Sequence, residues 1–445
     1  MSHQSQELRL KHLFDGGDWN VYAPDILNLG VGAPGTDLLE PCCDLFQQAT
    51  AHCLKREKNV NQSLIFQYGP TSGTFEVRHQ LAKYFSQMYD STVNRSVFLK
   101  ALFTLSLNDC FLHDCSEDLI ITTGATQGLH FVLSTLIDFN GCIFVDEFTY
   151  MIALDSMKHF TTLQIVPVKL NADGVDLIDL EEKVKTRQFK SKSKEFWGIY
   201  YTIPTYHNPT GILFSPDVCR GIVRLARKFD FLVLCDDVYN ILHYAEKPLH
   251  SRLLSYDVRT DGDYVGNVIS NGSFSKIIGP GVRLGWLEVP PRIKPQLDSS
   301  GIINSGGCFN NYTAGIVASL FELDLAQQHI ARVYESYKER MLATIAILNA
   351  ELPQECHFSA PRGGYFIWIS LPPELDAREF GQYCLKYEKI TFIPGPRFAV
   401  DNGIGKHYFR ISIAFHSTEK LVDGTKRLCS ALKSFMAKTS DGRQT

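Results

Sequence analysis

The sequence lacks the long apolar runs that a membrane protein needs. The apolar stretch at 231–235 is typical of those present, and it ends far short of the roughly 18 residues that cross a bilayer. The polar start of the chain also lacks the apolar stretch of a signal peptide. We therefore expect a soluble, cytoplasmic protein that has no membrane partner.

An excess of positive charge is also missing. The 445 residues include 44 Lys and Arg against 48 Asp and Glu, which gives a net charge of −4. A protein that binds a phosphate backbone presents a basic surface, so nucleic acid is not expected as a partner. The composition also excludes collagen, coiled coils and disorder.

Cysteine is present without the spacing of a disulfide framework. The chain has 12 cysteines, including the adjacent Cys42 and Cys43, which cannot easily bridge each other; reduced thiols are therefore expected. Cys110, His113 and Cys115 lie close together, but structural zinc normally has four ligands. We therefore expect a surface insertion over 96–117 and no metal site.

The chain is too long for one hydrophobic core, and its patterns alternate between strand and helix. A β-branched run at 119–123 precedes an amphipathic helix that we expect to end at Asn140, and a buried strand follows at 142–145. This cycle predicts an α/β fold, in which a large doubly wound domain has a mainly parallel sheet. Ligands of such sheets bind beyond the carboxyl ends of the strands.

A second cycle supports the same fold. A strand pattern at 196–201 is followed by Ser215 and Pro216, which are typical of a helix N-cap and first helical position. The run at 231–235 shows no alternation, which indicates a strand buried on both faces.

The pattern changes after about residue 295. Helical spacing at 325–352, apolar stretches at 364–369 and 408–415, and a closing helix from about Ser417 predict a smaller α+β lobe. No internal repeat and no linker rich in proline or serine divides the chain. We predict an N-terminal segment that is partly in the small domain (1–64), a large ligand-binding domain (65–295) and a small C-terminal domain (296–445).

The residues around Lys276 carry the clearest chemical signal. Ser273 and Ser275 precede the lysine, and Arg283 follows it within a glycine-containing stretch. Alone, such a lysine would be a solvated side chain. Among small hydroxyl residues at a strand end, beside an arginine, it suits a Schiff base to a phosphate-bearing aldehyde.

Two further segments follow predicted strands. Gly124, Ala125 and Thr126 open a helix whose free N–H groups suit an anion, although a structural N-cap would use the same residues. Asp236 follows a fully apolar strand, so its carboxylate would point into the cleft and need a cationic partner.

Together these segments resemble the class I and II aminotransferases, which are fold-type I enzymes that use pyridoxal 5'-phosphate. The resemblance extends over most of the chain. It implies that Lys276 anchors the cofactor and acts as general acid–base, and that Asp236 keeps the pyridine nitrogen charged. It implies a phosphate site made by Gly124, Ala125, Thr126, Ser273, Ser275 and Arg283.

The resemblance also assigns residues around the cofactor ring. Tyr239 and Asn208 would hydrogen-bond its phenolic oxygen, although Asn208 and the three residues after it also fit a simple turn. Tyr150 would stack on the ring, but Phe148 replaces the usual proline of that loop.

Three more positions concern the substrate and the partner subunit. Arg410 resembles the arginine that grips the substrate's α-carboxylate, although a strand arginine equally suits a structural ion pair. Asn208 and Gly32 would lie beside the substrate. Tyr68 resembles a tyrosine that reaches the phosphate of the neighbouring subunit, which implies a homodimer.

The implied activity is the transfer of an amino group from an L-amino acid to a 2-oxo acid such as 2-oxoglutarate. The sequence of segments 272–276 and 280–286 is most similar to that of the branch that contains 2-aminoadipate and kynurenine aminotransferases. The predicted pocket segments at 19–22 and 30–32 contain no arginine. We therefore expect long or aromatic donors ahead of aspartate, unless Arg397 enters the pocket.

Two alternative functions stay open at this stage. The same scaffold supports C–S β-lyases and related α-carbon lyases or synthases, which would release pyruvate with ammonia instead of exchanging an amine. A cofactor-binding sensor, like the aminotransferase-like half of certain transcription regulators, would need a basic DNA-binding domain ahead of this fold. The roughly 60 residues ahead of Gln67 are largely used by the N-terminal loop.

Overall fold

The computed structural model describes residues 25–60, 63–89, 116–244, 251–401 and 403–441. The candidate zinc ligands Cys110, His113 and Cys115 lie outside these ranges, as does the pocket segment at 19–22. Within them, no group of three or more His, Cys, Asp or Glu side chains is placed to hold a metal ion. No helix in the same ranges is long and apolar enough to cross a membrane.

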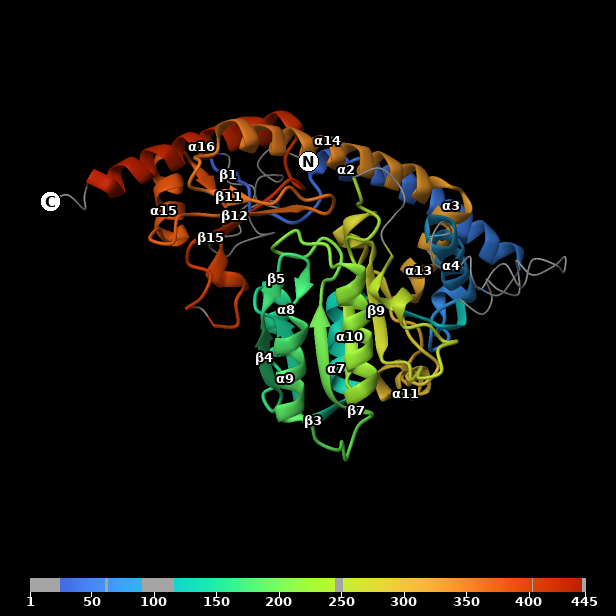
Figure 1. The fold of residues 1–445 in the computed structure, drawn as a ribbon. Coiled ribbons are helices and arrows are strands. Elements are labelled where there is room, and N and C mark those ends of the chain that lie inside the picture. The colour runs from blue at the N-terminus through green and yellow to red at the C-terminus, as the bar shows by residue number, and fades with distance from the viewer. Residues whose placement is uncertain (1–24, 61–62, 90–115, 245–250, 402, 442–445) are drawn as a thin grey trace.

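A seven-stranded sheet forms the centre of the large lobe (Figure 1). Only β10 runs antiparallel to its neighbours, and every other pairing in this sheet is parallel. The predicted α/β fold with a large, mainly parallel sheet is therefore confirmed. In spatial order the strands are β2 (Leu119–Thr122), β10 (Gly285–Glu288), β9 (Val268–Ser273), β8 (Leu232–Asp236), β7 (Phe196–Thr202), β3 (Ile137–Asp146) and β4 (Gln164–Val168).

Helices cover both faces of this sheet, and each face has its own hydrophobic core. Neighbouring residues of one strand alternate between the cores, so Tyr201 belongs to the first and Tyr200 to the second. The Ser215 hydroxyl accepts a hydrogen bond from the Val218 N–H, as the predicted N-cap requires. The helices are α7 (Ala125–Leu136) and α8 (Met151–Met157) against the first core, and α9 (Leu177–Arg187) and α10 (Pro216–Phe229) against the second.

The predicted end of the helix at Asn140 is wrong. Helix α7 ends at Leu136, and Ile137 already has the extended backbone of β3, with φ −101° and ψ 130°. Ile137 pairs with Phe196 in the sheet, and the ladder is irregular between Ile137 and Cys142. Ile137 thus belongs to the strand and not to the helix, although its spacing from the apolar residues of the helix fits either assignment.

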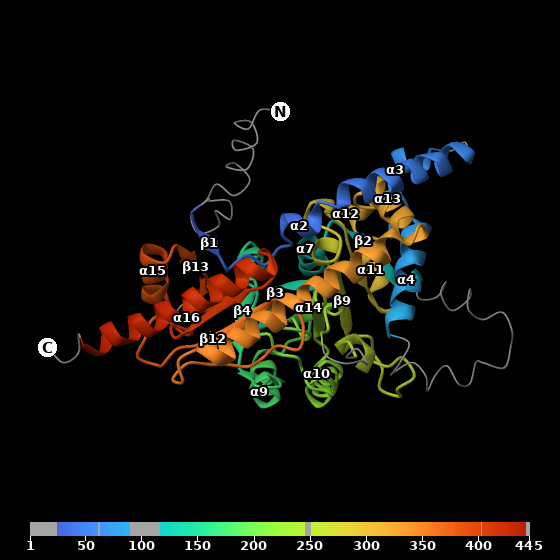
Figure 2. The same ribbon diagram turned by 90° about the horizontal axis from the view of Figure 1, so that it is seen from above.

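The small lobe contains an antiparallel sheet and long helices. Strand β1 (Leu27–Asn28) pairs with β13 (Ile390–Thr391), so the N-terminal segment joins this lobe. Helices α14 (Leu325–Glu351) and α16 (Thr418–Asp441) pack together over the sheet (Figures 1 and 2). The domain limits at 64 and 295 stay predictions. The sheet order is β11 (His357–Phe358), β12 (Phe366–Ser370), β15 (Tyr408–Ser412) and β14 (Ile393–Pro394), and α15 (Ala377–Tyr387) packs beside it.

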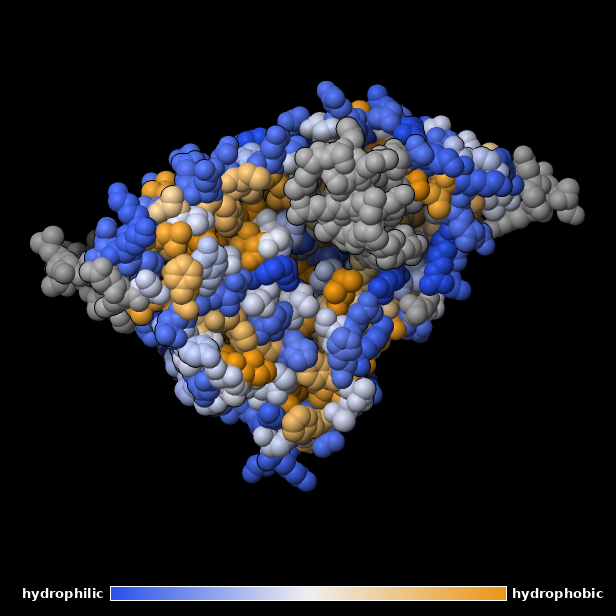
Figure 3. Space-filling view, turned by 180° about the vertical axis from the view of Figure 1, so that it is seen from behind, coloured by the Kyte–Doolittle hydropathy of each residue, from blue (hydrophilic) through white to orange (hydrophobic). Residues whose placement is uncertain are grey.

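A third group of helices borders the large sheet. Helix α13 (Asn311–Glu322) packs against α3 (Cys42–Asn59) and α4 (Phe75–Tyr89). On the face shown in Figure 3, hydrophobic residues lie in small groups between hydrophilic ones. The remaining elements are α2 (Thr36–Leu39), η2 (Leu64–Phe66), β5 (Leu170–Asn171), β6 (Gly174–Val175), η3 (Leu253–Tyr256), η4 (Phe274–Lys276), η5 (Pro280–Val282), α11 (Lys294–Asp298), α12 (Gly301–Asn304) and η6 (Gly395–Phe398).

Candidate active site

A cavity of about 220 Å³ lies where β7, β8 and β9 end and α7 begins. This is the position at which parallel α/β sheets bind their ligands. Most of the side chains that the sequence singled out line this one space. They are Ala125, Thr126, Tyr150, Asn208, Asp236, Tyr239, Ser273, Ser275, Lys276 and Arg283.

One end of the cavity is an anion cradle at the start of α7. Gly124 caps this helix with φ +106°, and a Cβ there would lie 3.4 Å from Nη2 of Arg283. The Ser273 hydroxyl donates to the Ser275 hydroxyl at 2.9 Å. The free N–H groups of the helix start, a guanidinium and two hydroxyls therefore converge at Gly124, whose positive φ favours a glycine.

Lys276 is contacted by the N-terminal segment and by the small lobe. Its Nζ donates to the Gly32 carbonyl at 2.7 Å, and the Tyr365 hydroxyl donates to its backbone carbonyl at 2.9 Å. A Cβ on Gly32 would lie 2.8 Å from the Phe366 ring, so the loop approaches the small lobe closely. Burial lowers the pKa of Lys276 to about 8, although the Asp236 carboxylate acts in the opposite direction. About a tenth of this lysine is therefore a neutral, nucleophilic amine at pH 7.

The side chains of Asp236 and Asp237 lie in different surroundings. The Tyr201 hydroxyl donates to Oδ2 of Asp236 at 2.6 Å, while the buried Oδ1 has no hydrogen-bond partner among the described residues. Burial raises the pKa of Asp236 to about 6. Asp237 instead accepts from the Ser270 hydroxyl at 2.5 Å and lines a separate small space with Arg252. Oδ1 of Asp237 also lacks a partner within the described ranges, but of the two residues only Asp236 lines the cavity.

Arg410 adjoins the cavity through Asn208. Its guanidinium donates to Oδ1 of Asn208 and to the Gly30 carbonyl, both at 2.6 Å. The side chain is 1% exposed, and its Nε has no partner among the described residues. Burial lowers the pKa of Arg410 to about 10. A buried cation that no described carboxylate neutralises is suited to an anionic ligand.

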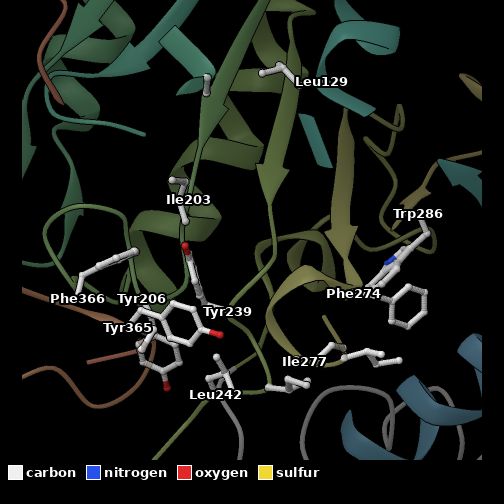
Figure 4. Close-up of a cluster of buried hydrophobic side chains, with 14 of the residues drawn as sticks. Leu129, Ile203, Tyr206, Tyr239, Leu242, Phe274, Ile277, Trp286, Tyr365 and Phe366 are labelled. Carbon is white, nitrogen blue, oxygen red and sulfur yellow. The ribbon is translucent and has the colours of Figure 1, made fainter. Parts of the chain in front are cut away.

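Two tyrosines and a group of aromatic rings border the ring-binding part of the cavity. Burial raises the pKa of Tyr150 to about 12 and that of Tyr239 well above its ordinary value, so both stay protonated phenols. The Tyr239 ring packs edge-on against Tyr365 and Phe366, with centroid separations of 5.3 and 5.7 Å (Figure 4). The small lobe thus supports the large-lobe tyrosine.

Tyr68 lies apart from this cavity, and its side chain is 79% exposed. The sequence interpretation missed Tyr201 and Tyr365, which contact Asp236 and Lys276. The alternation along 196–202 places Tyr200 and Tyr201 on opposite faces, which was a usable signal for Tyr201. Nothing in the sequence pattern points from Tyr365 to a lysine 89 residues away.

The residues present fit pyridoxal 5'-phosphate. The cradle at Gly124 suits its phosphate, the unpartnered Oδ1 of Asp236 suits its ring nitrogen, and Lys276 is a nucleophile for its aldehyde. When bound, the cofactor supplies an electron sink for the bond that is broken at the substrate α-carbon.

Comparisons with known proteins agree with this fit. The family described as aminotransferase class I and II matches residues 24–428. An aromatic-amino-acid aminotransferase from Thermococcus litoralis is 27% identical over 94% of this chain and 90% of its own length. A 2-aminoadipate transaminase from Thermus thermophilus is 27% identical over 93% of this chain and 92% of its own length.

A solved structure supports the same assignment. It is an α-aminoadipate aminotransferase from Thermus thermophilus complexed with N-(5'-phosphopyridoxyl)-L-leucine, and its TM-score is 0.74 at 25% identity. The match covers 98% of this chain and all of the other. Family, fold and site chemistry thus agree, and the chain belongs to the class I and II aminotransferases, enzymes that depend on pyridoxal 5'-phosphate.

Proposed function

We propose that this aminotransferase takes the amino group from L-amino acids with long or aromatic side chains, such as 2-aminoadipate or kynurenine, and passes it to a 2-oxo acid such as 2-oxoglutarate. The observation that carries the proposal is Arg410, a buried cation beside the cavity without a carboxylate partner among the described residues. The names of two relatives, an aromatic-amino-acid aminotransferase and a 2-aminoadipate transaminase, support this donor range.

In this proposal the residues of the site have the following roles. Lys276 would bind the cofactor aldehyde, and its amine would move the proton at the substrate α-carbon as general acid–base. Arg410 and Asn208 hold the α-carboxylate, and Asp236 holds the ring nitrogen. Tyr239 and Asn208 bind the phenolic oxygen, Tyr150 covers the ring, and Gly32 borders the substrate. The cradle residues Gly124, Ala125, Thr126, Ser273, Ser275 and Arg283 bind the phosphate.

A second fixed cation for a short dicarboxylate is not available among the described residues that line the cavity. Lys276 and Arg283 are the basic side chains of that lining, and both already have tasks. Arg397, the one candidate raised by the sequence, pairs with Asp155 at 2.8 Å on the surface. Aspartate therefore lacks a partner for its side-chain carboxylate in this lining. Aromatic side chains need none, and 2-aminoadipate carries its side-chain carboxylate farther from the α-carbon.

A donor screen tests the proposal. The purified yellow holoenzyme is mixed with each amino acid in turn, and loss of the visible cofactor band is recorded, followed by its return on addition of 2-oxoglutarate. We expect 2-aminoadipate, kynurenine and aromatic amino acids to act faster than aspartate. Aspartate as far the best donor would overturn the pocket argument. Pyruvate and ammonia as the main products, without return of the band, would identify a lyase instead.

We also propose a homodimer in which Tyr68 reaches the partner's phosphate site. Exposed aromatic and apolar side chains gather near Tyr68: Phe66 is 68% exposed, and its ring lies 5.8 Å from that of Tyr312, which is 43% exposed. Exposed apolar groups of this kind are typical of surfaces that pair. Sedimentation of a fully active monomer would refute the dimer. A cytoplasmic location is proposed because the ten described cysteines are all unpaired.

A further inference from the structure

The carboxylate of Asp236 depends on a residue with no assigned role. Within the described ranges the Tyr201 hydroxyl is its single hydrogen-bond donor, at 2.6 Å from Oδ2. Tyr201 lies on β7, beside the strand that ends at Asp236, and its side chain lines the cavity while remaining 0% exposed. Burial and the adjacent carboxylate raise the pKa of Tyr201 well above its ordinary value, so its phenol stays a donor.

Two bases share one proton when the cofactor is bound: the Asp236 carboxylate and the pyridine nitrogen. The ring withdraws electrons effectively only when the proton is on its nitrogen. Burial raises the pKa of Asp236 to about 6, and the charge of Asp237 acts in the same direction. The hydrogen bond from Tyr201 and the charge of Lys276 lower the same pKa. Tyr150 and Tyr239 also face this carboxylate, and both remain neutral phenols.

We infer that Tyr201 is a positioning residue that keeps this proton on the cofactor's ring nitrogen. Its hydroxyl donates to Oδ2, weakens the carboxylate as a base and leaves Oδ1 as the acceptor for the ring nitrogen. One hydrogen bond to a charged group changes a pKa by about one to two. A carboxyl pKa near 6 is close to that of a pyridinium, so a change of this size decides which base holds the proton.

Nuclear magnetic resonance of ring-¹⁵N-labelled pyridoxal 5'-phosphate in the holoenzyme tests the inference directly, because the nitrogen resonance reports its protonation. In Tyr201→Phe we expect the signal to move toward the unprotonated position and kcat to fall about 10- to 100-fold. Tyr200→Phe is the matched control. Tyr200 is the neighbouring tyrosine on the same strand, equally buried, and its hydroxyl donates to the Asp146 carboxylate at 2.5 Å. We expect the nitrogen signal to be unchanged in this control.

The inference rests on the proposed role of Asp236, and Asp236→Asn separates the two. If Asp236→Asn moves the nitrogen signal and Tyr201→Phe does not, the role of Tyr201 is wrong and that of Asp236 stands. If neither substitution moves it, both roles fail. Equal movement in Tyr200→Phe and Tyr201→Phe would mean a general loosening of β7 and would also overturn the inference.

A second probe preserves the hydroxyl in case Tyr201→Phe does not fold. Fluorotyrosine at position 201 is a stronger hydrogen-bond donor of nearly the same size. We expect it to make the carboxylate a weaker base, so that the ring nitrogen keeps its proton to a higher pH in a titration of the ¹⁵N signal. An unchanged or lowered midpoint would contradict the inference.

Discussion

Two carboxylates lie at the carboxyl ends of strands in the same sheet, and both are buried, but their surroundings differ. Asp146 is the last residue of β3. It accepts hydrogen bonds from the hydroxyls of Tyr200 at 2.5 Å and Thr202 at 2.8 Å, and it lies 3.2 Å from Nε2 of His207. Asp236 ends β8 and has one donor and one oxygen without a partner among the described residues. A carboxylate whose two oxygens are hydrogen-bonded within the protein stabilises the fold. A carboxylate that lines a cavity and keeps one oxygen without a partner is available to a ligand.

The comparison distinguishes these two carboxylates without reference to any relative. The same test applies to the cations. Arg227 is paired with Asp257 at 2.8 Å and is structural, whereas Arg410 has only neutral oxygen acceptors among the described residues. Asp236 and Lys276 line the cavity, and Arg410 adjoins it through Asn208. Asp237 also has an oxygen without a partner among the described residues, but it lies outside this lining.

Replacement of Lys276 by Ala gives the largest effect that the comparison predicts. Turnover should be lost, because the nucleophile and proton carrier of the cavity is removed. The apparent melting temperature of the apoprotein should stay close to wild type or rise, since a buried amine with a lowered pKa is lost. Transamination assays and thermal scans measure both. Full activity in this variant would refute the role of Lys276.

Asp236→Ala and Asp146→Asn test the two carboxylates against each other. Asp236→Ala should lower kcat by about a thousandfold or more with cofactor still partly bound, because the ring nitrogen loses its counter-charge. Asp146→Asn should instead destabilise the fold by about 1–3 kcal/mol, because buried donors lose their acceptor. Steady-state kinetics per cofactor-loaded molecule and urea titrations measure these effects.

Asp237→Asn is the neighbouring control for the same pair. Asp237 lies outside the cavity and bonds Ser270, so its replacement should affect stability more than kcat. Equal losses of kcat at positions 236 and 237 would contradict the distinction between them.

Arg410→Lys tests the unpaired cation. We expect KM for amino acid donors to rise about 100-fold, because an ammonium cannot reproduce the two parallel bonds of a guanidinium to a carboxylate. Simple amines, which lack that carboxylate, should be inactive with the wild-type enzyme. Arg397→Lys is the surface control and should leave KM unchanged, since Arg397 pairs with Asp155. A good amine substrate would show that Arg410 does not select the carboxylate.

Gly124→Ala probes the anion cradle. The positive φ opposes a side chain, and a Cβ would lie in contact with Arg283, so cofactor affinity should fall about tenfold. Gly281→Ala is the control, because a Cβ there would meet no atom within 4 Å. Equilibrium binding of the cofactor to both apoproteins measures the difference. Similar losses in both variants would refute the cradle.

The smallest predicted effect concerns pH. The neutral amine of Lys276 reacts with the cofactor aldehyde, and its pKa is about 8. The rate of cofactor uptake by the apoenzyme should therefore rise about tenfold per pH unit below that value and level off above it. Asp236→Asn should move this midpoint to lower pH, because the lost carboxylate charge had raised the pKa of the lysine. A midpoint near 10, as for a solvated lysine, would contradict the buried amine.

Much of the site was predictable because its residues follow strands. Strand ends are recognisable from apolar runs and turn residues, and parallel strands bring their carboxyl ends to one edge. Asp236, Lys276 and Gly124 could therefore be placed together from the sequence pattern. The family resemblance supplied Arg410 and Tyr68, whose positions no local pattern connects to the cavity.

Local spacing alone misassigned the helix end. Ile137 continues the apolar helical face, yet its backbone is extended and pairs with Phe196. An apolar residue at this position fits the end of the helix and the start of the strand equally well. Which of the two it joins depends on pairing with a strand about 60 residues later in the chain.

The sequence by itself determined the alternating α/β order, the mainly parallel sheet and the place of Lys276 at a strand end, because each rests on short-range sequence patterns. Only the tertiary structure decided which polar groups are satisfied. Tyr201 bonds Asp236, Tyr365 bonds the Lys276 carbonyl, and Arg397 turns to Asp155 on the surface. Those partners lie far apart along the chain, and which side chains meet depends on how the strands pair and how the lobes pack.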